Sequence, residues 1–245
     1  MKYSIRELNS NEFILYHHLG LGDHIICNGL VNYLSRDVNK IYLPVNNIFF
    51  EQIKYLYKNN DRVEVFAVNV PLVNNADEDI YKFAIQKSIP VLRVGFEYEK
   101  NSRKPFYKAF YKQFNIRYKI SYDYFQPPIE EKLADKNYRH LLDKFDINGE
   151  DYILVHDESS IENFELKIDS QLKRVSLSHR YDKYRNIFLY SKIIRNAKEI
   201  HCVNSSFLHL IDRLETNGSL IYHDIRGSKV KLNKKWNFIK YENKY

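Results

Sequence analysis

The fold is decided by the stretch Phe13-Ile14-Leu15-Tyr16-His17-His18-Leu19-Gly20-Leu21-Gly22-Asp23-His24-Ile25-Ile26. The apolar run over 13–17 is short and leads into a loop with two glycines, which is typical of a buried strand that ends at a turn. From residue 24 to residue 36 the apolar side chains recur at helical spacing. A strand, a glycine-containing loop and a helix in this order form the first unit of an α/β fold.

The same alternation of short apolar runs and helical patterns continues along the chain. Further strands are predicted at 41–45, 63–68, 90–95, 152–156, 174–177, 199–203, 219–222 and 236–239. Further helices are predicted over 49–57, 79–87, 129–144, 187–197 and 206–214. Three phenylalanines recur at a spacing of four residues, a pattern that indicates core packing: Phe106, Phe110 and Phe114. The alternation predicts parallel sheets with helices on both faces.

The alternation is interrupted between residues 103 and 148, and the pair Pro127-Pro128 inside this segment cannot continue a helix. Two α/β modules in tandem, split near residue 125, predict two Rossmann-like lobes that face a cleft. We expect an N-terminal lobe over 1–125 and a C-terminal lobe over 126–245.

The composition excludes several classes of protein. The 245 residues carry a formal charge of +7, but the 38 basic residues are spread among 31 acidic ones, so no nucleic-acid partner is expected. A mildly basic surface also suits anionic small substrates. The two cysteines, Cys27 and Cys202, lie in apolar segments with no zinc or disulfide spacing. No signal peptide or apolar run of about 20 residues is present, so we expect a cytoplasmic protein and leave attachment to a membrane surface open.

The first candidate site is the loop with Gly20 and Gly22, where a ligand can approach the backbone closely. It is not a dinucleotide fingerprint, because Ile25 stands where the third glycine belongs, and it lacks the Gly-Lys-Ser/Thr of a P-loop. Asp23 is predicted either to cap the following helix or to act as a general base, and both roles can hold together. His24 is the second candidate catalytic residue.

The second candidate site is Asn204-Ser205-Ser206, where a predicted strand meets a predicted helix. These side chains can cap the helix, and the same N–H donors and dipole can hold a diphosphate. Two further candidate donor contacts are His156 at the end of a strand and Arg174 on the next one. The alternative for His156 is a structural role, and the alternative for Arg174 is a solvated surface.

Two segments carry a resemblance to a known family. Gly20-Leu21-Gly22-Asp23-His24-Ile25-Ile26, after a strand and before a helix, resembles the start of the heptosyltransferase-like glycosyltransferases, family 9. Ala197 to Phe207 resembles the late second lobe of GT-B enzymes, where Ser205 and Ser206 stand at the turn that leads to the nucleotide-sugar site. The resemblance implies a compact GT-B fold, with acceptor and Asp23 on the first lobe and donor on the second.

The implied activity is metal-independent transfer of a sugar from a nucleotide-sugar to a glycan or lipid-linked acceptor, with no cofactor and with peripheral contact at the inner membrane face left open. The acidic run Asp77-Glu78-Asp79 matches the Asp-x-Asp of metal-dependent glycosyltransferases, but it precedes a predicted helix, where acids are ordinary dipole partners. Two alternatives remain: a GT-B-like sugar-nucleotide epimerase, and a non-catalytic module that binds nucleotide or nucleic acid.

Overall fold

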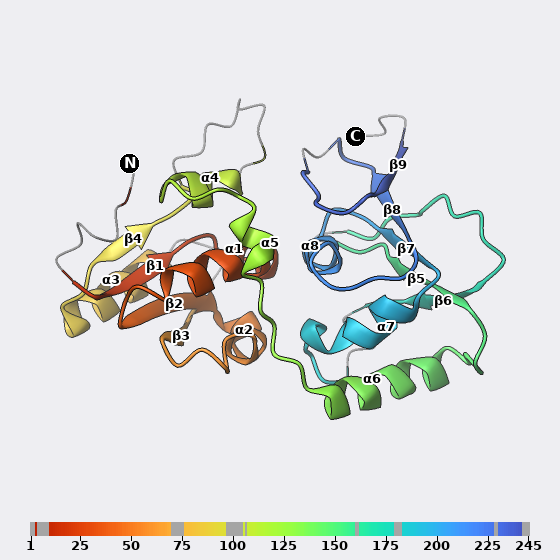
Figure 1. The fold of residues 1–245 in the computed structure, drawn as a ribbon, viewed down its shortest axis with the longest axis horizontal. Helices are drawn as coiled ribbons and strands as arrows, with labels where there is room; N and C mark the ends of the chain where they lie inside the picture. The colour runs from red at the N-terminus through yellow and green to blue at the C-terminus, as the bar shows by residue number, and fades with distance from the viewer. Residues whose placement is uncertain are drawn as a thin grey trace. The chain divides into compact units, whose positions relative to one another are not determined.

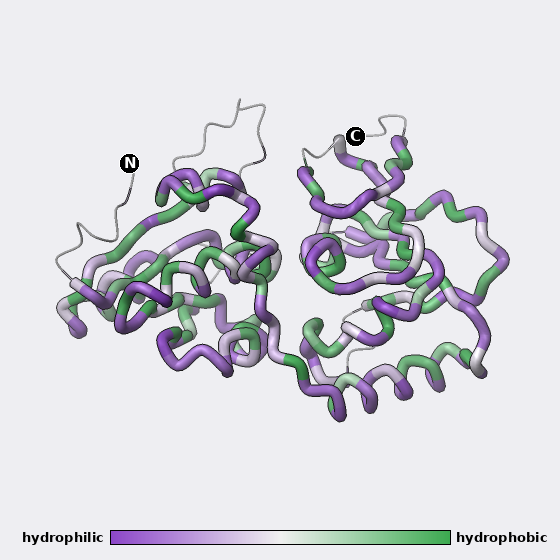
Figure 2. The backbone as a smooth tube through the Cα atoms, viewed as in Figure 1, coloured by the Kyte–Doolittle hydropathy of each residue, from purple (hydrophilic) through white to green (hydrophobic). Residues whose placement is uncertain are grey.

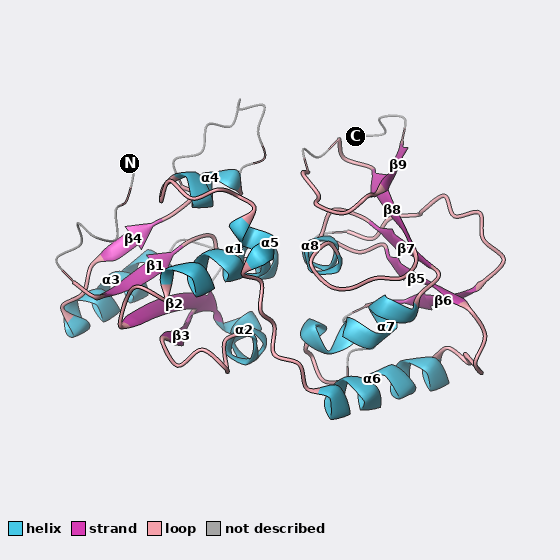
Figure 3. Ribbon diagram, in the orientation of Figure 1, coloured by secondary structure: helices cyan, strands magenta, loops and turns pink. Residues whose placement is uncertain are grey.

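The computed structural model describes residues 3, 10–69, 76–96, 105, 107–159, 162–178, 183–227 and 230–241. The chain divides into two compact units, Met1–Pro128 and Ile129–Tyr245 (Figure 1). The division falls directly after the proline pair and close to the boundary expected between residues 125 and 126. Each unit has its own sheet and its own helices (Figure 3).

The first unit contains a four-stranded parallel sheet in the order β3-β2-β1-β4. Its strands are β1 (Glu12–Tyr16), β2 (Lys40–Asn46), β3 (Val63–Val68) and β4 (Val91–Arg93). Four consecutive residues of β1, Phe13 to Tyr16, are buried, as expected for a central strand covered on both faces. The fourth strand is shorter than predicted, and the backbone turns at Gly95, where φ is +89°.

Helices cover both faces of this first sheet, as the sequence predicts. The helices are α1 (Leu21–Leu34), α2 (Phe50–Leu56), α3 (Ala76–Lys87), α4 (Lys108–Lys112) and α5 (Ile120–Asp123). The connections through α1 and α3 run in opposite directions along the sheet, and right-handed crossovers therefore place these helices on opposite faces. On the face covered by α3, Ile80 and Ala84 pack with Ile14, Tyr16 and Tyr42 of the strands.

The helix α1 is almost entirely buried because α5 packs closely on it. A Cβ atom at Gly29 would lie 2.4 Å from the carbonyl oxygen of Ile120, so only glycine permits this approach. The Ser121 hydroxyl donates to the carbonyl oxygen of Ile26 at 3.3 Å. The aromatic stripe is only partly described: Phe110 and Phe114 are buried, α4 is five residues long, and Phe106 lies outside the described residues.

The second unit contains a five-stranded parallel sheet in the order β6-β5-β7-β8-β9. Its strands are β5 (Tyr152–His156), β6 (Lys173–Ser176), β7 (Glu199–Cys202), β8 (Ser219–Asp224) and β9 (Asn237–Lys240). Its helices are α6 (Glu131–Lys144), α7 (Ser191–Asn196) and α8 (Ser206–Ile211). The α/β prediction with two Rossmann-like sheets is confirmed.

Two helices of the second unit show how the sequence pattern becomes local structure. Ala134, Asn137 and Leu141 of α6 are buried at helical spacing, and polar and apolar residues alternate along this helix in Figure 2. The helix predicted over 187–197 instead begins as a 3-10 helix at Ile187–Tyr190, where the Asn186 side chain accepts the N–H of Phe188 at 3.1 Å and caps the first turn. Among the described residues, no helix combines the length and the apolar character needed to cross a membrane.

Candidate functional site

The strand orders place a candidate site at one edge of each sheet. In open parallel sheets, ligands bind outside the carboxyl ends of the strands where the strand order reverses. In the first unit this point lies between β1 and β4, at the loop that contains Gly20. In the second unit it lies between β5 and β7, where Asn204 and Ser205 follow β7. Both segments singled out in the sequence therefore lie where ligands gather in this class of fold.

The predicted N-cap role of Asp23 is wrong in its position. The residue that precedes α1 is Gly20, and Asp23 is the third residue of the helix. The Asp23 carboxylate accepts the backbone N–H of Gly20, which is the reciprocal bond of a capping box. A Cβ atom at Gly20 would lie 2.8 Å from Asp23 Oδ2, so a larger residue there would require the Asp23 side chain to shift. Gly22, the other loop glycine, lies inside the first turn of α1.

The electrostatic environment of Asp23 suits proton transfer near neutral pH. Burial raises the pKa of Asp23 to about 7, and the hydrogen bond from Gly20 offsets only part of that shift. Among the described residues, no basic side chain lies within ion-pair distance of this carboxylate. A carboxylate with a pKa close to the working pH combines a useful ionised fraction with useful basicity.

The histidines around this loop are mostly enclosed in the core. His24 is fully buried, and neither ring nitrogen has a hydrogen-bond partner among the described residues. Its ring meets that of His17 edge-on at 4.5 Å, and burial lowers the pKa of both. His24 thus has no direct access to a substrate in this conformation. Of the three histidines near the loop, His18 is the one that reaches the surface, where its ring packs on Phe96 at 4.9 Å.

A polar cluster that the sequence did not reveal flanks the same edge of the first sheet. Tyr16 at the end of β1 donates its hydroxyl proton to Asp77 Oδ1 at 2.6 Å, and Arg93 at the end of β4 lies 3.5 Å from Asp77 Oδ2. The Arg93 guanidinium also stacks on Phe96, 4.5 Å from the ring centre. These bonds pair Asp77 within the first turn of α3, and the described residues contain no group of acids, histidines and cysteines arranged to hold a metal.

In the second unit, Ser205 caps α8 as the sequence predicts. Its side chain accepts the N–H of Leu208 at 3.5 Å. Ser206 is the first helical residue, and Asn204 precedes the cap; both are partly exposed at the carboxyl edge of the sheet. The helix that follows is only six residues long, so its dipole contributes little and the local N–H groups matter more.

The two other predicted donor contacts differ in their access to solvent. His156 is buried, its Nδ1 lies 3.1 Å from the carbonyl oxygen of Leu177, and its ring packs on Phe207 at 4.3 Å. This position favours the structural role for His156. Arg174 is exposed on β6, donates to the Ser176 hydroxyl at 3.0 Å and forms an ion pair with Asp157.

Arg226 is a candidate ligand contact that sequence analysis missed. It follows β8, and its guanidinium bonds to the Glu162 carboxylate and to the Ser159 hydroxyl, the latter at 3.2 Å. With Asn204 and Phe164 it lines a small cavity at the carboxyl edge of the second sheet. The signal that could have identified it is a basic residue in the loop that follows a predicted strand.

A chain of hydrogen-bonded side chains crosses the same sheet. Glu199 Oε2 lies 3.1 Å from His201 Nε2, and His201 Nδ1 lies 3.0 Å from His223 Nε2. His223 Nδ1 lies 2.8 Å from the Tyr241 hydroxyl, which also accepts the N–H of Lys167. Because a carboxylate only accepts, neutral imidazoles satisfy the chain in one direction, with each histidine donating from Nε2 and Tyr241 donating its hydroxyl proton. Burial lowers the pKa of both histidines and favours this neutral form.

Comparisons with known proteins support the fold. No protein-family model matches the chain, and no curated protein matches it. Among solved structures, the chain is similar to the crystal structure of the glycosyl transferase family 9 from Veillonella parvula DSM 2008, with a TM-score of 0.56 over 96% of this chain and 88% of that chain. The two sequences are 8% identical, so the similarity shows the fold alone. The fold-level part of the resemblance found in the sequence is thereby confirmed.

Proposed function

We propose that this protein is a metal-independent glycosyltransferase that moves a sugar from a nucleotide-sugar to a hydroxyl group of a glycan or lipid-linked acceptor. The observation that carries the proposal is Asp23, a half-buried carboxyl with a pKa of about 7 at the point where the strand order of the first sheet reverses. The fold similarity to a family 9 glycosyl transferase supports the class of reaction.

In this proposal Asp23 is the general base. The acceptor hydroxyl gives its proton to the Asp23 carboxylate while its oxygen forms a bond to the anomeric carbon of the donor sugar. The bond between that carbon and the diphosphate oxygen breaks, and the diphosphate leaves with the electron pair. Positioning by the Gly20 N–H keeps the carboxylate fixed on the first turn of α1.

The proposal assigns the leaving diphosphate to the carboxyl edge of the second sheet. The N–H groups around Ser205 and Ser206, together with the side chains of Asn204 and Arg174, supply donors for its oxygens. Arg226 adds a second guanidinium at the same edge. With charge stabilised in this way, the reaction needs neither a metal ion nor a cofactor.

The decisive experiment measures binding and turnover together. A panel of nucleotide-sugars is screened for stabilisation against heat, and the stabilising donor is then incubated with acceptors in the presence and absence of EDTA. We expect saturable stabilisation by one donor class, contacts within residues 156–226, and sugar transfer that chelation leaves unchanged. Conversion of the donor without an acceptor would instead indicate an epimerase. Stabilisation by RNA alone, with strong salt dependence, would indicate a nucleic-acid module.

A further inference from the structure

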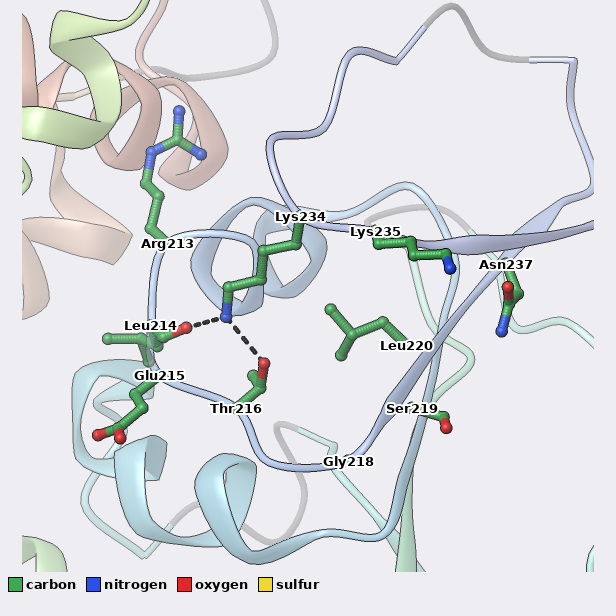
Figure 4. A pocket seen from close by; sticks show the side chains of 10 residues that line it. All are labelled: Arg213, Leu214, Glu215, Thr216, Gly218, Ser219, Leu220, Lys234, Lys235 and Asn237. Carbon is green, nitrogen blue, oxygen red and sulfur yellow. Dashed lines mark hydrogen bonds between the residues drawn. The ribbon is translucent and has the colours of Figure 1, made fainter.

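A second cavity lies at the opposite edge of the second sheet, where β8 and β9 begin. Its volume is about 790 Å³, which falls in the range of small-molecule sites, about 300–1,000 Å³. Figure 4 shows the side chains around it; the ones used below are Lys234, Lys235, Arg213, Glu215 and Thr216. It is separate from the carboxyl edge that we assign to the donor.

The position of Lys234 in this cavity is fixed by the backbone around it. The buried Asp212 carboxylate accepts the N–H groups of Lys234 at 3.0 Å and Asn233 at 2.9 Å, and it also accepts the indole N–H of Trp236 at 3.0 Å. Three N–H groups bound to one carboxylate therefore hold the segment before β9 in one conformation, with the Lys234 side chain directed into the cavity (Figure 4).

The Lys234 ammonium has an unused capacity to bind an anion. It donates to the carbonyl oxygen of Leu214 and to the Thr216 hydroxyl at 2.9 Å, which leaves one of its three N–H donors available. Among the described residues, no carboxylate lies within ion-pair distance of this ammonium. Burial lowers the pKa of Lys234 to about 8, while the charges of Asp212 and Glu215 raise it, and an anion bound directly to the ammonium would further favour its charged form.

The remaining charges around the cavity also favour an anion. Arg213 and Lys235 line it beside Lys234, and the carboxylate among its lining residues, Glu215, is engaged by Arg195 at 3.3 Å. Lys234 and Lys235 line the cavity and the lining carboxylate, Glu215, is already paired, so this lining suits an anion better than a metal cation. Lysine ammonium groups are common phosphate ligands in proteins.

We propose that this cavity binds a phosphate group carried by a small molecule, with Lys234 and Lys235 as its cationic ligands. The size of the cavity favours a small molecule over a polyanionic chain, which would need basic residues spread along a surface track. Bound phosphate would accept the remaining N–H donor of the Lys234 ammonium. This site is independent of the glycosyltransferase proposal, since it lies at the other edge of the sheet.

The test uses inorganic phosphate as the probe and the full chain as the protein. Binding is followed by calorimetry and by thermal stability, against sodium chloride at equal ionic strength. We expect saturable binding that Lys234→Met weakens by about 10- to 100-fold, the effect of losing a hydrogen bond to a charged group. Lys235→Met should weaken it less. The control Lys132→Met, an exposed lysine on α6, should leave it unchanged.

Several results would overturn this proposal. One is the absence of saturable phosphate binding to the unaltered protein, a measurement that does not depend on any variant. Another is binding that persists in both Lys234→Met and Lys235→Met. A third is tighter, salt-sensitive binding of an acidic peptide or RNA at the same residues, which would show that the ligand is a polymer and not a small molecule. Nucleotide-sugar binding should be the same in all these variants, so failure here and failure of the proposed function are distinguishable.

Discussion

Replacing Asp23 by asparagine should stabilise the protein at alkaline pH while it abolishes most of the turnover. The pKa of Asp23 is raised from 3.8 to about 7, so the native state holds this proton more tightly than the unfolded chain does. The free energy of unfolding therefore falls as pH rises from 3.8 towards 7, by about 1.4 kcal/mol per unit and ~4 kcal/mol in all. Asparagine carries no titrating proton and escapes this loss.

The measurement is the difference in unfolding free energy between Asp23→Asn and the unaltered protein, from urea titrations at about pH 5 and about pH 8. Other titrating groups are the same in both proteins and cancel in the difference. Between about pH 5 and about pH 8 this difference should shift by ~3 kcal/mol in favour of the variant. Asparagine can still accept the Gly20 N–H, so the helix start is preserved.

Turnover of the same variant should fall by ~10²–10⁴-fold, the usual contribution of a general base, while donor affinity stays nearly unchanged. Asp37→Asn makes the same chemical change at an exposed position after α1 and should alter neither quantity. If the difference in unfolding free energy between Asp23→Asn and the unaltered protein does not change with pH, the raised pKa of Asp23 is refuted. Normal turnover in a variant with the expected pH response would show that Asp23 is not the base and would direct attention to His18.

Three further predictions concern the metal requirement, the second sheet and acid stability. Turnover should survive EDTA; loss of turnover that Mn²⁺ restores would implicate the acidic first turn of α3. Arg226→Gln should weaken nucleoside diphosphate binding by about tenfold or more. Glu162→Gln should strengthen it by up to about fivefold, because it removes an exposed ion pair to Arg226 that contributes ~0.2–1 kcal/mol. If calorimetry shows that both variants change binding equally, Glu162 does not compete with the diphosphate for Arg226. Burial lowers the pKa of His17 and His223 from 6.5 to about 4. The free energy of unfolding should therefore fall as pH drops from 6.5 towards 4, by up to ~3 kcal/mol for each histidine. An unfolding free energy from urea titrations that stays constant over this pH range would exclude neutral buried imidazoles.

Much of the fold could be predicted because strands that are buried on both faces appear as continuous apolar runs. The strand at 152–156 is buried throughout and has the predicted bounds, as does the more exposed edge strand at 63–68, whereas the first helix begins at Leu21, three residues before the predicted start. The strand order depends on packing between distant segments, which local patterns do not encode. The short helix α5 was not predicted, because its contact with α1 depends on a glycine inside that helix.

The candidate site was only partly predictable for a related reason. Asp23 and Ser205 were found because each lies at a junction between a predicted strand and a predicted helix, and parallel strands present their carboxyl ends at one edge. Whether a side chain near that edge faces solvent depends on what packs over it. His24 and His156 are covered by aromatic rings from other segments, and no local pattern distinguishes them from exposed histidines.

The two edges of the second sheet should respond differently to anions, because their basic side chains are paired differently. At the carboxyl edge, Arg174 is bound by Asp157 and Arg226 by Glu162. A phosphate must displace a carboxylate there, and each displacement reduces the net affinity and selects for ligands with further contacts to the protein. At the opposite edge, the Lys234 ammonium has hydrogen bonds to neutral oxygens only, so a phosphate adds to them without displacing a charge. A simple anion should therefore occupy the Lys234 cavity at lower concentration than the carboxyl edge, whereas a nucleoside diphosphate should prefer the carboxyl edge.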